Sequence, residues 1–184
     1  MLIKHELIEF FRYNNIDTIF HLPGIHTLSL NESLFKSNIN NFIGRHENNI
    51  VAMADGYART SGKVGFVIVT PGPGLGNTVS GCLEAFSDDI PLIILHVDTG
   101  REEIGKGILH ELIEPESIFT NFTKKTFVIA KTADVIPVFE EAYKTSTSDR
   151  KGPVLISMPH MFFDKEMPRE EGFKGSRGRG IEIK

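Results

Sequence analysis

Residues 64–97 read VGFVIVTPGPGLGNTVSGCLEAFSDDIPLIILHV, and this stretch decides the fold. Its two apolar runs, 64–70 and 90–97, are too short for buried helices and rich in β-branched or aliphatic residues, so they predict strands buried on both faces. A Pro-Gly turn breaks the first strand, and residues 75–86 predict a helix. A strand, a helix and a second buried strand in this order indicate a parallel sheet covered by helices.

The same alternation continues on both sides of this stretch. Apolar spacing predicts helices over residues 2–14, 26–36, 47–60, 115–120 and 133–147. Shorter apolar runs predict strands over residues 18–21, 41–44, 127–130 and 154–157, and residues 98–114 predict a functional or connecting loop. We therefore expect an open, doubly wound, mostly parallel α/β sheet with helices on both faces. Residues 1–163 should form this domain, and residues 164–184 a flexible, basic, glycine-rich tail or linker.

The composition is that of a globular chain, with 184 residues, 40% hydrophobic residues and 24% charged residues. The formal net charge of −4 argues against nucleic acid or a membrane surface as a partner. The single cysteine, Cys82, cannot form an internal disulfide, and no apolar run approaches the roughly 20 residues that cross a bilayer. Charged residues interrupt the amphipathic N-terminal segment, which is therefore unlike a signal peptide. These features predict a cytoplasmic protein.

The glycine-rich turn at residues 70–77, TPGPGLGN, is the first candidate for a binding site. A turn between a strand and a helix exposes N–H groups that can hold an anion or a polar ring. Asp98 ends the next strand, roughly where the ribose-binding acid of a dinucleotide site would be. However, the glycines are spaced G-x-G-x-G, and Asn77 occupies the third position of the dinucleotide fingerprint G-x-G-x-x-G. A nucleotide site, another ligand site and a plain tight turn all remain open.

Glu47 is the second candidate, because it lies where a predicted strand leads into a predicted helix. The carboxyl ends of parallel strands share one edge, so Glu47 and the glycine turn should face the same crevice. The alternative role is that of a first-turn acid, which stabilises a helix by about 0.3–1 kcal/mol. Two independent segments thus indicate one site.

Four motifs resemble a known family. They are IFHLPG at residues 19–24, RHENNIVAMADGYAR at 45–59, TPGPGLGNTVSGCLEAFSDDIPLIIL at 70–95 and GPVLISMP at 152–159. Together they resemble the N-terminal pyrimidine-binding domain of thiamine diphosphate enzymes, above all the acetolactate synthase and 2-oxoacid decarboxylase group. The resemblance covers about residues 2–163, with the motifs in the family's order.

The resemblance implies roles for individual residues. Glu47 matches the family's catalytic glutamate, whose carboxyl bonds a ring nitrogen of the cofactor's aminopyrimidine and favours the tautomer that removes the thiazolium C2 proton. His110 falls where some decarboxylases carry paired histidines, and could bind the substrate carboxylate or relay a proton; a surface histidine on a loop is the alternative. The residues that match the family's pyrimidine pocket are Pro23, Gly24, Thr70, Gly72, Pro73 and Asn77.

The resemblance also implies what lies outside the chain. Family enzymes bind the diphosphate through Mg²⁺ in a second domain marked by GDG, and the nearest string here is ADG at residues 54–56, inside the glutamate helix. We therefore expect thiamine diphosphate with Mg²⁺ held by a diphosphate-binding domain, on another chain or in a C-terminal region. The other histidines lack a paired ligand spacing, so no metal site is expected in this chain. A homodimer or hetero-oligomer should complete the site.

The function implied is that of the N-terminal domain or subunit of an acetolactate synthase-like enzyme. Such an enzyme acts on 2-oxoacids by decarboxylation and carboligation, and this chain would supply the catalytic glutamate. One alternative is the alpha subunit of a split sulfopyruvate or phosphonopyruvate decarboxylase. Another is a non-catalytic binding module, against which the retained Glu47 argues.

Overall fold

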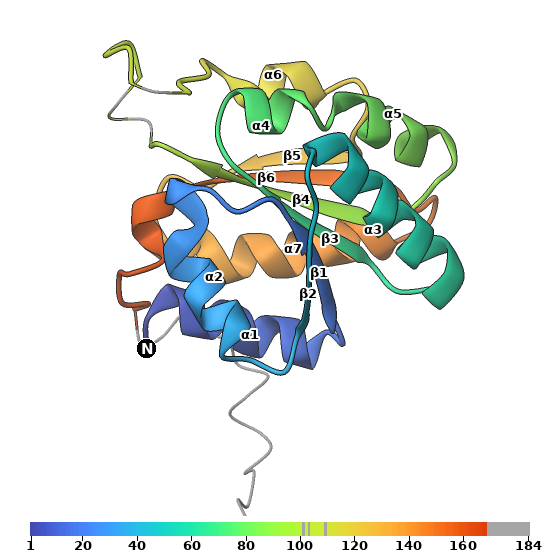
Figure 1. The fold of residues 1–184 in the computed structure, drawn as a ribbon, viewed down its shortest axis with the longest axis horizontal. Coiled ribbons are helices and arrows are strands. Elements are labelled where there is room, and N and C mark those ends of the chain that lie inside the picture. Colours follow the sequence, from blue (N-terminus) through green and yellow to red (C-terminus); the bar gives the residue numbers. More distant parts are fainter. Residues whose placement is uncertain (101, 103, 109, 169–184) are drawn as a thin grey trace, which may run out of the picture.

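The computed structural model describes residues 1–100, 102, 104–108 and 110–168. Its sheet has six strands in the order β2-β1-β3-β4-β6-β5, and all neighbouring strands are parallel (Figure 1). The predicted α/β class is confirmed. The strands are β1 (Thr18–His21), β2 (Asn40–Ile43), β3 (Gly65–Val69), β4 (Leu92–Asp98), β5 (Lys125–Val128) and β6 (Val154–Pro159).

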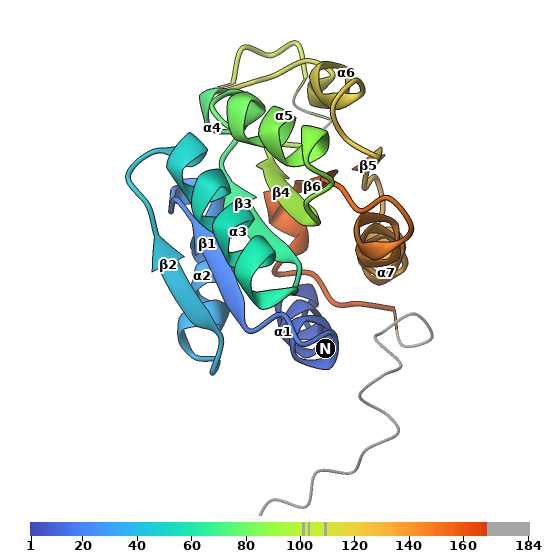
Figure 2. The same cartoon turned by 90° about the vertical axis from the view of Figure 1, so that its right-hand side faces the viewer.

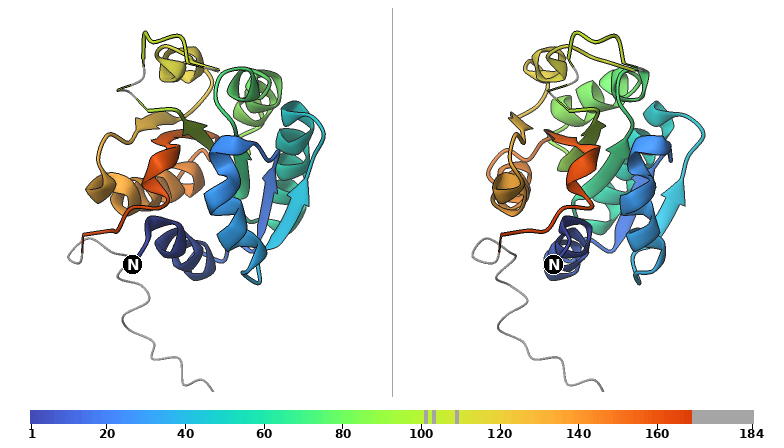
Figure 3. Two further views of the ribbon diagram at one scale, coloured as in Figure 1. Left: turned by 60° about the vertical axis from the view of Figure 1, so that its left-hand side comes forward. Right: turned by 90° about the vertical axis from the view of Figure 1, so that its left-hand side faces the viewer.

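Helices cover both faces of the sheet (Figures 2 and 3). One face carries α1 (Ile3–Tyr13), α2 (Leu28–Phe35) and α7 (Val135–Thr147), and the other carries α3 (Glu47–Ser61), α5 (Val79–Ser87) and α6 (Pro115–Phe119). Successive residues of β3 divide between the two cores: Phe66 and Ile68 join one, and Val67 and Val69 join the other. The strand sequences are continuously apolar because both faces are buried.

Two of the differences between the predicted and observed elements have a clear physical reason. The helix predicted over residues 75–86 is two helices, α4 (Pro73–Gly76) and α5. Pro73 is the first residue of α4, and this helix ends at Gly76. Just beyond it, the hydroxyl of Thr78 donates to the carbonyl of Leu75 at 2.7 Å. Strand β5 begins at Lys125 rather than residue 127, because this edge strand is polar: the Lys125 ammonium pairs with Glu141 and lies 4.6 Å from the Phe127 ring centroid.

The chain remains packed for a few residues beyond residue 163. Glu166 forms a β-bridge with Leu2, and the N–H of Met167 donates to the carbonyl of Met1 at 3.0 Å. Asp164 pairs with Lys4 at 2.7 Å, and Met167 is buried. Residues 164–168 therefore stay against the start of α1, and the remainder of the predicted tail, 169–184, lies outside the described residues.

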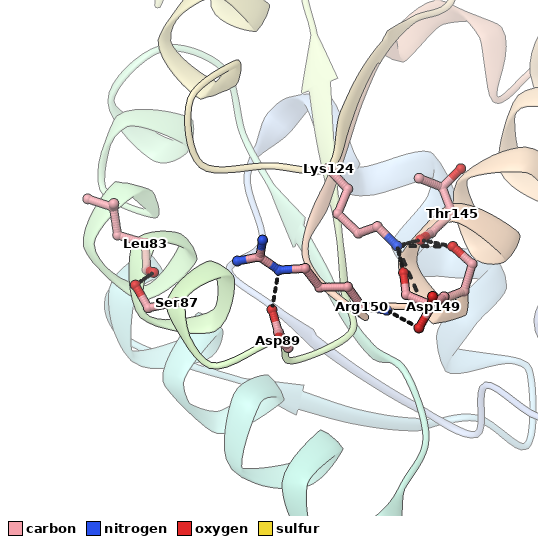
Figure 4. A network of polar contacts seen from close by, with 8 residues as sticks. Leu83, Ser87, Asp89, Lys124, Thr145, Asp149 and Arg150 are labelled. Carbon is pink, nitrogen blue, oxygen red and sulfur yellow. Dashed lines mark hydrogen bonds and ion pairs between the residues drawn. The ribbon is translucent and has the colours of Figure 1, made fainter.

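At the amino edge of the sheet, Lys124 closes the end of α7 (Figure 4). Its ammonium donates to the carbonyls of Thr145 at 2.5 Å and Asp149 at 3.3 Å. A cation at this place also complements the negative end of the helix dipole. Nearby, Arg150 pairs with Asp89 at 3.0 Å and joins the end of α5 to the start of β6. The amino edge is thus closed by ion pairs and helix caps.

Asp17, just before β1, ties the strand to α3 and should carry a measurable part of the acid sensitivity of folding. Its carboxylate accepts hydrogen bonds from Lys63 and, at 2.6 Å, from the hydroxyl of Tyr57. The Lys63 bond, followed by the Tyr57 bond, lowers the pKa of Asp17 from 3.8 to about 2. A carboxyl group whose pKa is lowered by folding stabilises the folded protein at pH values above its pKa in the unfolded state. This stabilisation is lost as the pH falls through the pKa of the folded state.

We therefore expect Asp17→Asn to lower the free energy of unfolding at pH 7 by about 1 kcal/mol, a small value because the Asp17 side chain is 45% exposed. The difference from the wild type should shrink as pH falls from 3.8 towards 2. Urea unfolding at a series of pH values measures it, with Glu84→Gln on the exposed face of α5 as the matched control. A difference that stays constant over that interval would contradict the assignment.

Candidate active site

The site lies at the carboxyl edge of the sheet, where α3 begins. His46 caps this helix: its Nδ1 accepts the N–H of Asn48 at 3.2 Å, so its ring proton is on Nε2. Glu47 follows as the first residue of the helix and is only 8% exposed. The cap therefore fixes a buried carboxyl beside the positive end of a helix dipole.

The glycine turn reaches this carboxyl through Asn77. The side-chain amide of Asn77 donates to Oε2 of Glu47 at 2.9 Å. The break between α4 and α5 comes directly at this residue, and α5 is held against α3 by the N–H of Gly81, which donates to Oδ1 of Asn48 at 2.9 Å. The two segments that the sequence placed at one crevice are therefore joined by a hydrogen bond.

Two glycines allow close packing of the backbone around Thr70, beside Glu47. A Cβ at Gly74 would lie 2.4 Å from Oγ1 of Thr70 and 3.5 Å from Oε1 of Glu47. A Cβ at Gly24 would lie 2.5 Å from Cγ2 of the same Thr70. Thr70 thus lies between the loop after β1 and the turn after β3, and both approach it more closely than any residue with a side chain could. Pro23 and Pro73 are exposed beside these glycines.

Gly24 is held by a hydrogen-bond network that the sequence alone does not indicate. The hydroxyl of Thr27 accepts the N–H of Gly24 and donates to its carbonyl, each at 3.0 Å. The side-chain amide of Asn31 in turn donates to the Thr27 hydroxyl at 3.0 Å. Thr27 and Asn31 are both buried. A Gly-x-x-Thr pattern directly after the Pro-Gly motif is the sequence signal that could have indicated this turn.

Thr27→Val should destabilise the protein by about 1–3 kcal/mol, because the isosteric side chain leaves the N–H of Gly24 and the amide of Asn31 without an acceptor. Thr27→Ser keeps the hydroxyl and should cost clearly less. The urea unfolding midpoints of the two variants provide the measurement. Equal midpoints would mean that the hydroxyl bonds contribute nothing and that packing alone holds the loop.

His110 meets the glycine turn through its backbone. Gly72 has a φ of +59°, and a Cβ there would lie 2.7 Å from the carbonyl oxygen of His110. Glu111 accepts the N–H groups of Gly105 and, at 2.8 Å, of Gly107, which folds this irregular segment back on itself. The predicted residues are therefore connected by contacts into one cluster around Glu47: Gly24, Glu47, Thr70, Gly72, Asn77 and His110.

The arrangement offers hydrogen-bonding groups to a polar ring. Gly24 and Gly74 carry no side chain and pack their backbone against Thr70, and the buried carboxyl of Glu47 lies next to Gly74. Among the described residues, no group of three or more His, Cys, Asp or Glu side chains is arranged to hold a metal ion. No helix in the described part of the chain is both long enough and apolar enough to span a membrane.

Known proteins resemble this chain in sequence. Residues 1–118 match the family model described as thiamine pyrophosphate enzyme, N-terminal TPP binding domain. The chain is 36% identical over 154 residues to the chloroplastic acetolactate synthase of Arabidopsis thaliana, covering 83% of this chain and 23% of that protein. It is 35% identical over 146 residues to a probable 2-ketoarginine decarboxylase of Pseudomonas aeruginosa, covering 78% of this chain and 26% of that protein.

Solved structures show the same architecture. A benzoylformate decarboxylase from Polynucleobacter necessarius superimposes with a TM-score of 0.86 at 28% identity, over 91% of this chain and 32% of that one. A 4-hydroxybenzoylformate decarboxylase from Rhodococcus jostii superimposes with a TM-score of 0.88 at 22% identity, over 100% of this chain and 34% of that one. The chain thus spans about a quarter of the length of its curated relatives and a third of these structures.

Proposed function

The chain belongs to the N-terminal TPP-binding domain family of thiamine pyrophosphate enzymes, and from this premise we propose that it supplies the pyrimidine half of a thiamine diphosphate site in an acetolactate synthase-like enzyme. The observation that carries the proposal is the buried Glu47 carboxyl, which accepts a hydrogen bond from Asn77 and lies beside the close-packed glycines Gly24 and Gly74. The substrates are 2-oxoacids, which the enzyme decarboxylates and joins to a second carbonyl compound.

Each residue of the cluster around Glu47 has a role in this proposal. Glu47 holds a proton at a ring nitrogen of the aminopyrimidine, and Asn77 orients the carboxyl that does so. Pro23, Gly24, Thr70, Gly72 and Pro73 line the ring. When bound, thiamine diphosphate supplies the carbon nucleophile for the keto group and accepts the electron pair released with carbon dioxide.

His110 contributes to the substrate side of the site. Its backbone lies against Gly72, so its side chain is carried by the segment that borders the glycine turn. A neutral imidazole there can donate a hydrogen bond to the substrate carboxylate or relay a proton. His110 is exposed in this chain, and a facing domain would enclose it.

The rest of the site belongs to a partner. The diphosphate and Mg²⁺ are held by a second domain, on another chain or in a C-terminal region. A surface for such a partner, or for a second copy, is supported on α3 and β2, where Phe42 is 48%, Ile43 53% and Met53 39% exposed. Phe42 and Met53 also line a groove of about 560 Å³ together with Phe20 and Tyr57. Exposed apolar surface of this kind marks interaction sites.

Calorimetry separates this half-site from its alternatives. The chain alone should bind thiamine diphosphate weakly or not at all in the presence of Mg²⁺, and the assembled enzyme should bind it tightly. Tight Mg²⁺-dependent binding by the chain alone would contradict the proposal that the chain supplies only the pyrimidine half of the site. Binding of NAD in the same instrument would instead support the dinucleotide alternative, and failure of the assembled enzyme to bind thiamine diphosphate would support a non-catalytic module.

A split sulfopyruvate or phosphonopyruvate decarboxylase is the second candidate function. It is supported by a group of histidines at the carboxyl edge of the sheet, described below, and by the decarboxylase among the relatives. The two functions differ in products: the synthase forms a carbon–carbon bond from two molecules of 2-oxoacid, and the decarboxylase releases an aldehyde. Product analysis with pyruvate and with sulfopyruvate, on the complex purified from its native source, distinguishes them.

A further inference from the structure

Two histidines far apart in the sequence meet at the carboxyl edge of the sheet. His26 lies in the single turn η1 (Ile25–Thr27) after β1, and His160 begins the turn η4 (His160–Phe162) after β6. Their rings pack edge to face, with centroids 5.2 Å apart and an interplanar angle of 81°. Figure 3 shows η4 beside the start of α2 in both views. Neither residue has a role in the site described so far.

The orientation of the His160 ring is fixed by the backbone. Its Nδ1 lies 3.2 Å from the carbonyl oxygen of Asp98. A carbonyl only accepts hydrogen bonds, so Nδ1 carries the proton and Nε2 is the atom that can take up a second one. His160 is therefore held by one nitrogen and presents the other for a ligand.

The charges around His26 would favour the binding of an anion. Burial first, and then repulsion from His160 and His110, lowers the pKa of His26, and Asp98 acts in the opposite direction. Asp98 is itself buried, and its Oδ1 already accepts the N–H of Thr99 at 2.7 Å. His96, the next buried imidazole on β4, stays neutral because burial lowers its pKa to about 4. His26 thus lies near two further imidazoles, His160 and His110, and near the Asp98 carboxylate, and an added anion would favour its charged form.

His26 and His110 lie next to residues of the cluster around Glu47. His26 follows Gly24 by two residues, and the backbone of His110 lies against Gly72. Both glycines belong to the cluster of predicted site residues around Glu47. A 2-oxoacid bound next to the cofactor could therefore extend along the strand ends towards His26 and His160.

We propose that His26, His160 and His110 form a specificity subsite that binds a second acid group of the substrate, a carboxylate, sulfonate or phosphonate at the end distant from the keto acid. The inference rests on the proposed function and names its substrate class, a 2-oxoacid with two anionic groups. Imidazoles suit this task because a neighbouring anion favours the charged imidazolium, and a substrate without the second acid group lacks this interaction.

The first experiment needs no cofactor and uses the full 184-residue chain. Histidine ring signals are followed by NMR during titration with methylphosphonate, methanesulfonate or acetate in a buffer without phosphate. We expect a saturable shift of the His26 and His160 signals and a rise in the pKa of His26 with at least one probe, and the probe that binds best identifies the acid group. His26→Asn and His160→Asn should each weaken binding about tenfold, the loss of one charge-assisted hydrogen bond. His5→Asn, at an exposed position of α1, is the control.

The second experiment uses the assembled enzyme and compares pyruvate with oxaloacetate, sulfopyruvate and phosphonopyruvate. His26→Asn should lower the ratio of kcat/KM for the preferred two-acid substrate to that for pyruvate about tenfold. No saturable shift with any of the three probes, or an unchanged ratio, overturns the subsite. Failure of the proposed function is separate, because it appears as loss of thiamine diphosphate binding by the assembled enzyme, which the NMR titration does not involve.

Discussion

Glu47→Gln in the assembled enzyme is expected to stop hydrogen–deuterium exchange at C2 of bound thiamine diphosphate, with a loss of at least about a hundredfold. The reason is that the amide cannot give or take the proton at the aminopyrimidine nitrogen. The substitution should leave the fold intact, because Gln has the same length and its carbonyl can still accept the hydrogen bond that Asn77 donates to Oε2 at 2.9 Å.

Two measurements make this result specific. The first is C2 exchange, followed by NMR after acid quench; the second is the affinity for thiamine diphosphate, which should change far less than the exchange rate. Glu84→Gln removes an exposed carboxyl from α5 and should alter neither quantity. If Glu47→Gln exchanged C2 at the wild-type rate, Glu47 would be a helix-end acid without a part in the chemistry.

Gly74→Ala should give the second large effect. The new Cβ would lie 2.4 Å from Oγ1 of Thr70, and Thr70 cannot easily move because its β-branched side chain has few rotamers. We expect a loss of stability of about 1–3 kcal/mol. Because the turn must shift, Asn77 moves relative to Glu47, and the assembled enzyme should also lose at least about tenfold in thiamine diphosphate affinity.

Gly76→Ala is the matched control for Gly74→Ala. It lies in the same short helix α4, and a Cβ there meets nothing within 4 Å. Urea unfolding of the chain and calorimetry on the assembled enzyme provide the measurements. The double variant Gly74→Ala/Thr70→Ala removes the clashing hydroxyl and should recover most of the lost stability. Equal behaviour of the two alanine variants would show that the close packing of Gly74 against Thr70 is not required.

The site was predictable where a residue acts through its own chemistry. Glu47 and the glycine turn were assigned to one crevice because parallel strands end at a common edge, and the structure joins them through Asn77. The sequence did not indicate Thr27 and Asn31, since their effect is to hold Gly24. Nor did it distinguish His26 and His160 from the other histidines, because the contact between their rings arises only when η1 and η4 fold onto the same edge.

The break after α4 shows the limit of periodicity. Residues 75–86 carry a helical pattern, yet the chain forms two helices. The pattern records which residues are buried, and both α4 and α5 bury theirs against the same core. It does not record that Asn77 must turn towards Glu47, a requirement set by a residue thirty positions earlier.

The amino-acid sequence by itself determined the layered architecture, the parallel sheet and the family, because continuous apolar strands and local turn motifs are properties of neighbouring residues. Only the tertiary structure decided the contacts around Glu47 and the contact between the histidine rings. Those depend on contacts between the ends of β1, β3, β4 and β6, and the sheet order brings these segments together irrespective of their distance along the chain.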